Sequence, residues 1–211
     1  YGSVYFAQEM LKDVGEQLEG KVCVVSGSGN VAQFTTEKLI ELGAKVVTLS
    51  DSSGFIHEPD GITRDKLDYV MDLKNNRHGR LEEYAKEFGC AYYADQKPWG
   101  IACDCAFPSA TQNEIVAEDA HDLIKNGCRL VCEGANMPTD YFAVKKFQQA
   151  KLLYAPGKAS NAGGVAISGL EMTQNSMRLT WQRDEVDRRL KEIMRNIHEQ
   201  CIEYGREEGG Y

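Results

Sequence analysis

The sequence contains no long uninterrupted hydrophobic run, although a membrane-spanning helix needs about 20 consecutive apolar residues. Its first residues also lack the basic and then apolar pattern of a secretory signal. Basic side chains are in the minority, since 24 Lys and Arg stand against 32 Asp and Glu and the net charge is -8. This balance argues against general binding to nucleic acids or anionic membranes. We expect a soluble cytoplasmic protein with no nucleic-acid or membrane partner, in which any phosphate-binding site is local.

Cysteines number seven, an odd count that no complete set of disulfides can use. Cys23, Cys105, Cys128 and Cys132 lie in or beside short apolar segments that are typical of buried strands. Reduced thiols in the core are therefore expected. Cys103 and Cys105 form the closest pair, but no second pair of ligands completes a tetrahedral metal site. No metal is expected.

Internal repeats and low-complexity segments are also absent, and 211 residues suit one domain, or one domain plus an appendage. Short apolar runs that end in turn residues alternate with segments of helical spacing. Such alternation predicts right-handed crossovers and a doubly wound α/β fold of the Rossmann type, with a mostly parallel sheet covered on both faces. Strands are expected at residues 21–27, within 44–51, and at 90–93, 103–107, 129–133 and 152–155; helices are expected at 1–11, 31–42, 63–75, 81–88, 118–126 and 139–150.

The C-terminal part, from Val165 to about Tyr204, has helical spacing throughout. A break is expected near residues 180–185, where Thr180 or Asp184 could cap a new helix. Residues 157–171, which overlap the start of this part, contain mostly Gly, Ala and Ser, and these small residues allow a backbone to approach a flat or charged ligand. We interpret this stretch as a loop that runs into the start of a helix.

A dinucleotide-binding fingerprint follows the first expected strand, where residues 27–32 read Gly-Ser-Gly-Asn-Val-Ala. Gly27 allows the tight turn, Gly29 allows a pyrophosphate to approach, and Ala32 lets helix and strand pack closely. The helix N-terminus offers N–H groups and the positive end of its dipole to the anion. A glycine-rich turn without a ligand is the alternative. The expected cofactor contacts here are Gly27, Ser28, Gly29, Asn30 and Val31.

At the end of the second strand, NAD-binding domains usually offer an acid to the adenine ribose. Here Asp51 is followed by Ser52 and Ser53, whose hydroxyls can donate hydrogen bonds to a 2′-phosphate. Lys74 could supply the countercharge, which favours NADP over NAD. The alternatives are that Lys74, with Arg77 and Arg80, forms an ordinary solvated helix end, and that the cofactor is NAD.

Three later strand ends carry side-chain amides, in residues 108–113, 133–139 and 155–164. Each amide offers both a donor and an acceptor, as a nicotinamide carboxamide and its ribose require. Alone, each amide is more typical of a turn or a helix cap. The expected contacts are Ala110, Thr111, Gln112, Asn136 and Asn161.

Together, the segments VSGSGNVAQ, SDSSG, KPWG, ATQNE, EGANMPT, APGKASNAGGVAISGLEM and IHEQC resemble the cofactor-binding domain of hexameric glutamate dehydrogenases of the bacterial small-subunit type. The SDSSG segment with Lys74 is similar to the NADP-using branch. The resemblance covers essentially the whole chain and implies one NAD(P)-binding domain over residues 1–211, with 165–211 as a helical extension. It also implies a fragment, without the N-terminal substrate domain and the C-terminal return segment, and a homo-hexamer for the full-length chain. Phe107 and Ser109 depart from the family pattern.

The activity that the resemblance implies is the reversible oxidative deamination of L-glutamate to 2-oxoglutarate and ammonia. Hydride passes between the substrate and nicotinamide through 2-iminoglutarate. Asn161 would lie near the nicotinamide, and Gly164, Val165 and Ser168 would face the side-chain carboxylate of the substrate. The family's catalytic lysine and aspartate lie in the domain that this sequence lacks. We therefore expect no catalytic residue here, and an isolated chain that binds NADP but turns over poorly.

Two other functions remain open. A sister amino-acid dehydrogenase acting on leucine, phenylalanine or valine would share the fold and the chemistry. The hydroxyl of Ser168 suits a substrate carboxylate better than a hydrocarbon. A non-catalytic dinucleotide-binding or sensory module would need no second domain.

Overall fold

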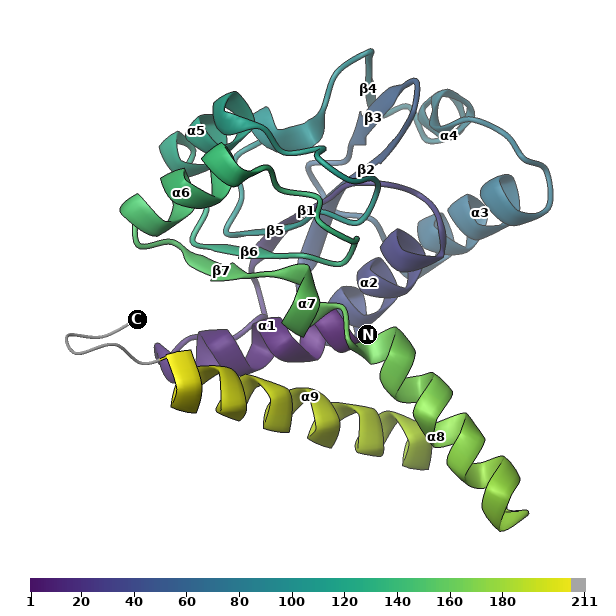
Figure 1. Cartoon of the computed structure of the whole chain (residues 1–211). Coiled ribbons are helices and arrows are strands. Elements are labelled where there is room, and N and C mark those ends of the chain that lie inside the picture. The colour runs from purple at the N-terminus through teal and green to yellow at the C-terminus, as the bar shows by residue number, and fades with distance from the viewer. Residues whose placement is uncertain (206–211) are drawn as a thin grey trace.

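The computed structural model describes residues 1–205 and confirms the predicted fold class. One sheet with the strand order β4-β3-β2-β1-β5-β6-β7 is flanked by helices (Figure 1). The strands are β1 Val22–Val25, β2 Lys45–Asp51, β3 Gly54–His57, β4 Ala91–Ala94, β5 Cys105–Phe107, β6 Leu130–Cys132 and β7 Leu153–Ala155. The helices are α1 Gly2–Asp13, α2 Asn30–Glu41, α3 Arg64–Asn75, α4 Leu81–Phe88, η1 Pro98–Gly100 (a 3-10 turn), α5 Ala117–Lys125, α6 Tyr141–Gln149, α7 Gly157–Ser160, α8 Gly163–Met177 and α9 Arg183–Gly205.

Parallel pairing runs from β2 through β1, β5 and β6 to β7, as the alternation of strands and helices predicted. Strand β3 was not predicted, and it is antiparallel to both of its neighbours, β2 and β4. It follows β2 after only two residues, and no helix separates the two strands, so the alternation of strands and helices did not signal it. Long-range contacts hold it: Ile56 is fully buried, and Phe55 stacks on Tyr93 of β4 with ring centroids 4.7 Å apart.

The two faces of the sheet carry two apolar clusters. Alternate residues of a strand point to opposite faces. Val25 of β1 belongs to the cluster that includes residues of α1, α2 and α3, whereas Val24 belongs to the cluster that includes residues of α5 and α6. The buried thiols belong to these clusters, and every cysteine is free, as predicted. Burial raises the pKa of Cys132 and keeps its sulfur in the thiol form.

The C-terminal helices confirm the expected break and correct two predictions. Residues 157–160 form a short helix, α7, where a loop was expected, and α8 starts at Gly163. The break falls at residues 178–182. The suggested caps Thr180 and Asp184 were wrong: α9 begins after Gln182, whose carbonyl accepts a hydrogen bond from Val186 N at 3.1 Å.

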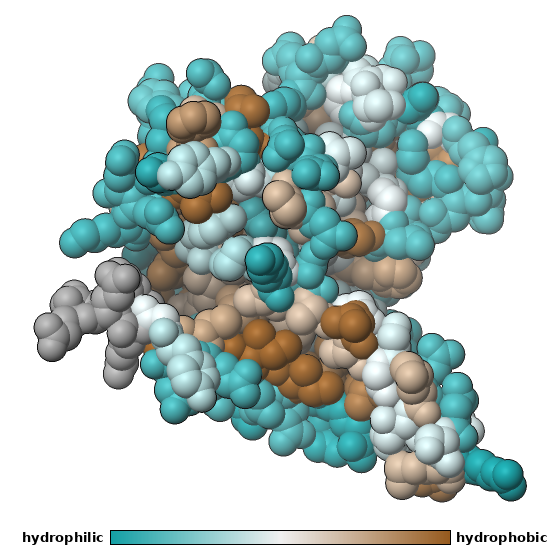
Figure 2. Space-filling view, viewed as in Figure 1, coloured by the Kyte–Doolittle hydropathy of each residue, from teal (hydrophilic) through white to brown (hydrophobic). Residues whose placement is uncertain are grey.

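Helix α9 lies beside α1, and α8 projects away from the body of the molecule (Figure 1). Only Gly163 of α8 is buried, and Val165 and Met172 are each 72% exposed. Apolar surface gathers along α9 and at the start of α8 (Figure 2). In the described part of the chain, no helix has the length and apolarity needed to cross a bilayer.

A glycine pair joins α1 to the start of α8. A Cβ atom at Gly163 would lie 2.7 Å from the Cα of Gly2. We expect Gly163→Ala to lower the free energy of unfolding by about 1–3 kcal/mol, because overpacking forces the two helices apart. Gly169→Ala is the matched control, because nothing lies within 4 Å of that Cβ position on the same helix. The control should be neutral or stabilising by up to about 1 kcal/mol, through helix propensity. Urea denaturation of both variants measures the difference, and equal stability of the two would contradict this account.

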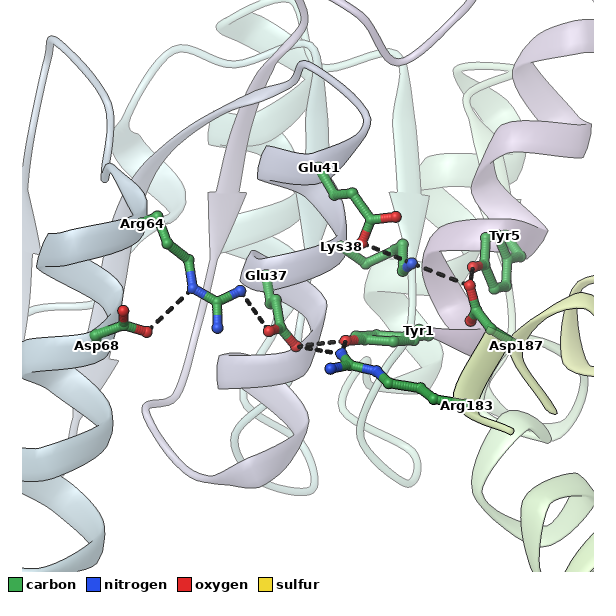
Figure 3. Close-up of polar contacts among 9 residues, drawn as sticks. All are labelled: Tyr1, Tyr5, Glu37, Lys38, Glu41, Arg64, Asp68, Arg183 and Asp187. Carbon is green, nitrogen blue, oxygen red and sulfur yellow. Dashed lines mark hydrogen bonds and ion pairs between the residues drawn. The ribbon is translucent and has the colours of Figure 1, made fainter. Parts of the chain in front are cut away.

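A polar network ties α9 to α2 through α1 (Figure 3). Asp187 of α9 accepts hydrogen bonds from Tyr5 at 2.6 Å and from the buried Lys38 of α2 at 3.2 Å. The neighbouring Glu37 is also buried, and it accepts from Tyr1 at 2.5 Å and from Arg64 of α3. The network therefore fixes α2, whose first residues carry the glycine fingerprint.

Glu37 makes this network sensitive to acid. Burial opposes ionisation of Glu37, but hydrogen bonds from Tyr1 and Arg64 outweigh it and hold the pKa below the ordinary 4.5. A depressed pKa contributes stability above the unfolded value, and this contribution is lost as the pH falls through the folded value. We expect Glu37→Gln to cost about 1–2 kcal/mol at neutral pH. The difference should shrink below about pH 4.5, the ordinary carboxyl range. Urea titrations at several pH values test this, and a gap that does not change with pH would contradict it.

Candidate functional site

The predicted site residues lie mainly in the connections that follow the carboxyl ends of β1, β2, β5, β6 and β7. From β1 the chain continues to β2 on one side, and it later returns to place β5 on the other side. Strand order thus reverses between β1 and β5. In open α/β sheets, ligands bind outside the strand ends at this reversal.

The turn after β1 is held tightly by its neighbours. Gly27 has φ +83°, and a Cβ atom there would lie 2.9 Å from the carbonyl oxygen of Ser109, in the turn after β5. Its N–H donates to the Ser50 hydroxyl at 2.7 Å. Ser28 is buried, and its carbonyl accepts from Gln33 at 2.8 Å. This position therefore requires both the positive φ that glycine adopts easily and the absence of a side chain.

Gly29 differs from Gly27, because it precedes α2 in an ordinary extended conformation, with φ −81° and ψ −173°. No atom lies within 4 Å of the position that its Cβ would occupy. No side chain caps α2 there, so the first N–H groups of this helix keep their free hydrogen-bonding capacity. Asn30 and Val31 begin the helix and are exposed. The turn thus presents an anion-binding helix end beside open space.

Asp51, at the end of β2, is turned into the protein. Its side chain is 5% exposed and accepts hydrogen bonds from Leu81 N at 3.0 Å and Ser53 N at 2.9 Å. Lys74 lies 3.5 Å from the same carboxylate and donates to the Gly79 carbonyl at 2.8 Å. Asp51 and Lys74 thus hold the start of α4 against the β2–β3 turn.

Arg80 is the cation that reaches this turn directly. Its Nη1 donates to the Ser52 hydroxyl at 2.6 Å, and both side chains are exposed. From the sequence, Arg80 was expected only as part of a solvated helix end. Its place at the Ser52 hydroxyl depends on the packing of α4 against β3, which no local pattern shows.

The loops after β5 and β6 support each other. The N–H groups of Gly134 and Ala135 donate to the Pro108 carbonyl at 2.9 and 3.0 Å, and Asn113 N donates to the Met137 carbonyl at 3.0 Å. These bonds place Ala110, Thr111 and Gln112 in an exposed turn beside the β1 turn. Phe107 and Ser109, the departures from the family pattern, are both buried.

Glu114 holds this turn through a hydrogen bond to its backbone. It was not among the predicted site residues. Its carboxylate accepts from Ala110 N at 3.0 Å. Burial raises the pKa of Glu114, while hydrogen bonds from Ser26 and from the Ala110 and Thr111 backbone oppose the shift. Two signals in the sequence pointed to it, because Glu114 lies two residues after the predicted contact Gln112 and ends the segment ATQNE.

Asn136 and Asn161, 25 positions apart, are brought into contact. The Asn161 side-chain amide donates to the Asn136 Oδ1 at 2.6 Å and to the Ala135 carbonyl at 3.4 Å. Helix α7 presents Asn161 at its C-terminal end. Two of the predicted amides therefore form one unit, whereas Gln112 lies in the separate turn after β5.

The expected substrate contacts lie on the first turns of α8. Gly164, Val165 and Ser168 are exposed there, and the Ser168 hydroxyl donates to the Gly164 carbonyl at 3.4 Å. They follow Asn161 by only three to seven positions, so they lie next to the amide pair along the chain. Within residues 1–205, no three His, Cys, Asp or Glu side chains cluster as metal ligands.

Comparison with known proteins gives consistent matches. The profile of the Glutamate/Leucine/Phenylalanine/Valine dehydrogenase family matches residues 1–211. The chain is 63% identical to a glutamate dehydrogenase of Bacteroides thetaiotaomicron and covers 48% of it. It is 54% identical to the NADP-specific glutamate dehydrogenase of Escherichia coli over 98% of the chain and 46% of that protein. Plasmodium falciparum glutamate dehydrogenase is similar in structure, with a TM-score of 0.94 and 50% identity over 97% of this chain and 44% of that one.

The chain thus spans about half the length of the curated relatives that it matches. The matched half includes every strand-end connection described above, from the glycine turn to the start of α8. The chain belongs to the Glutamate/Leucine/Phenylalanine/Valine dehydrogenase family.

Proposed function

We propose that this chain is the coenzyme-binding domain of an NADP-dependent glutamate dehydrogenase. The observation that carries the proposal is the 63% and 54% identity to proteins named as glutamate dehydrogenases, over nearly the whole chain. The full-length enzyme would interconvert L-glutamate with 2-oxoglutarate and ammonia. We assign residues 1–211 to this domain, of which 165–211 form the helical extension, and a cytoplasmic homo-hexamer to the full-length protein.

The geometry around α2 fits a dinucleotide. The open space beside Gly29 and the uncapped start of α2 suit a pyrophosphate, because helix N-terminal N–H groups bind anions. Backbone groups of residues 27–31 would hold the diphosphate. The Ala110–Gln112 turn and the Asn136–Asn161 pair would contact the nicotinamide and its ribose through amide donors and acceptors. Bound NADP would supply the hydride acceptor, and this chain's residues would orient it.

The β2–β3 turn supports NADP as the cofactor. Ser52 and Arg80 together offer a hydroxyl and a guanidinium to a 2′-phosphate, and arginine pairs with phosphate in a bidentate way. Lys74 would add positive charge from behind the turn, where it already pairs with Asp51. A contact between Asp51 and the adenine ribose stays a prediction, and its carboxylate would have to serve both the ribose and Leu81 N.

The start of α8 would bind the substrate. Gly164, Val165 and Ser168 are exposed beside Asn161, and the helix N-terminus suits the side-chain carboxylate of glutamate. Small residues here would leave room for the nicotinamide ring and the substrate together. A hydroxyl at Ser168 favours a carboxylate over the hydrocarbon side chain of leucine or valine.

Two measurements test this function. Titration of NADPH fluorescence with this chain should give a saturable signal, and no signal at millimolar cofactor would overturn the cofactor assignment. The full-length protein should reduce NADP with L-glutamate as substrate. A preference for leucine, phenylalanine or valine would reassign the substrate and leave the family unchanged. Cofactor binding without any turnover by the full-length protein would support a non-catalytic binding module instead.

A further inference from the structure

Glu133 is a buried carboxylate at the end of β6, with only 2% of its surface exposed. In the described chain no lysine or arginine forms an ion pair with it, and neutral donors satisfy it instead. Its Oε1 accepts from the Tyr154 hydroxyl at 2.7 Å, and its Oε2 accepts from Gly157 N at 2.6 Å. Burying a carboxylate without a countercharge is costly, so this position requires a reason.

Two hydrogen bonds tie Glu133 to α7. Besides the Gly157 N–H, the Ser160 hydroxyl donates to the Glu133 carbonyl at 2.6 Å. Both ends of α7 are thus tied to Glu133, the residue that follows β6. Tyr154 anchors the same carboxylate to β7, and burial, then the hydrogen bond to Glu133, raises the pKa of its phenol, which stays a donor.

The fit around Gly157 shows how little freedom α7 has. A Cβ atom at Gly157 would lie 2.9 Å from the Ala135 carbonyl oxygen and 3.2 Å from the Glu133 Oε2. The next residue after α7 is Asn161, which donates to the Ala135 carbonyl and to Asn136. The Glu133 carboxylate therefore sets the distance across which the two amides meet.

We propose that Glu133 is a positioning residue for the nicotinamide end of the cofactor, because it holds α7 so that Asn161 meets Asn136. It acts through these amides and contacts no ligand itself. The proposal rests on the NADP-binding function proposed above. It predicts that losing the carboxylate harms binding of the nicotinamide half, and that the half bound by Gly29, Ser52 and Arg80 is unaffected.

The test compares two ligands on each variant by calorimetry: NADPH, and 2′,5′-ADP, which has the adenosine and the 2′-phosphate but no nicotinamide. Glu133→Ala should raise the Kd of NADPH about tenfold or more, as expected for losing hydrogen bonds to a charged group. Its Kd for 2′,5′-ADP should stay within about twofold. Tyr154→Phe removes one donor, leaves the Gly157 bond, and should give a smaller shift of the same kind. This milder variant serves if Glu133→Ala does not fold.

Glu58→Gln is the matched control, because Glu58 is another buried carboxylate, paired with Lys66 away from these loops. It should change stability while leaving the ratio of the two Kd values unchanged. Asn161→Ala should weaken NADPH in the wild type but add little in Glu133→Ala, since coupled residues are non-additive.

An equal loss of affinity for both ligands in Glu133→Ala or Tyr154→Phe would overturn the proposed role of Glu133 but not the proposed function. Fully additive effects of Glu133→Ala and Asn161→Ala on the Kd of NADPH would do the same. A wild-type chain that binds neither ligand would overturn the proposed function and this role with it.

Discussion

Replacing Gly29 with alanine should raise the Kd of NADPH and of NADH by the same factor, about 10- to 100-fold, without changing the melting temperature. The backbone of Gly29 is in an extended conformation that alanine adopts freely, and no atom beyond the adjacent residues lies within 4 Å of the new methyl group. The methyl group would occupy the space in which we place the pyrophosphate. Both cofactors share this diphosphate, so neither should be favoured.

Gly100→Ala is the control for Gly29→Ala. Nothing lies within 4 Å of its Cβ position either, and it lies in η1, outside the strand-end loops. It should leave both affinities and the stability unchanged. Fluorescence titration measures the affinities, and thermal denaturation measures the fold. If Gly29→Ala binds NADPH as tightly as the wild type, the diphosphate does not lie at the start of α2.

Replacing Arg80 with alanine should separate the two cofactors. The guanidinium donates a hydrogen bond to the Ser52 hydroxyl, and in the described chain no carboxylate forms an ion pair with it. It is therefore available to a 2′-phosphate without loss of an internal ion pair. A hydrogen bond to a charged group contributes about 1.5–3 kcal/mol. We expect the Kd of NADPH to rise about 10- to 100-fold, while the Kd of NADH stays within about twofold.

Two further variants serve as comparisons for Arg80→Ala. Lys74→Ala should also weaken NADPH selectively, but it should lower stability as well, because it leaves the buried Asp51 carboxylate without its cation. Lys86 lies in α4, the helix that begins directly after Arg80. Lys86→Ala removes an exposed charge that pairs with Glu82, and it should change the affinity for neither cofactor. An equal loss of NADPH and NADH binding in Arg80→Ala would refute recognition of the 2′-phosphate at this turn.

The strand β3 and the helix α7 show where reading the sequence failed. Strand β3 follows β2 with no helix between them, so it departs from the alternation of strands and helices. Helix α7 reads Gly-Lys-Ala-Ser, which has no apolar spacing. Their stability comes from partners distant in the chain, such as Tyr93 for Phe55 and Glu133 for Gly157. The elements that follow the alternation of strands and helices were predicted to within a few residues, because their apolar runs and end signals are local.

The sequence by itself determined the fold class and the position of the glycine turn between β1 and α2. It also determined which residues lie in the loops that follow successive parallel strands. Those features depend on the order of residues within about a dozen positions, through hydrophobic spacing and the conformational freedom of glycine. The tertiary structure decided that Asp51 faces inward, that Arg80 reaches Ser52, and that Glu133 holds α7. Each of these contacts joins residues 24 to 30 positions apart, so its geometry exists only after the sheet and its helices have packed.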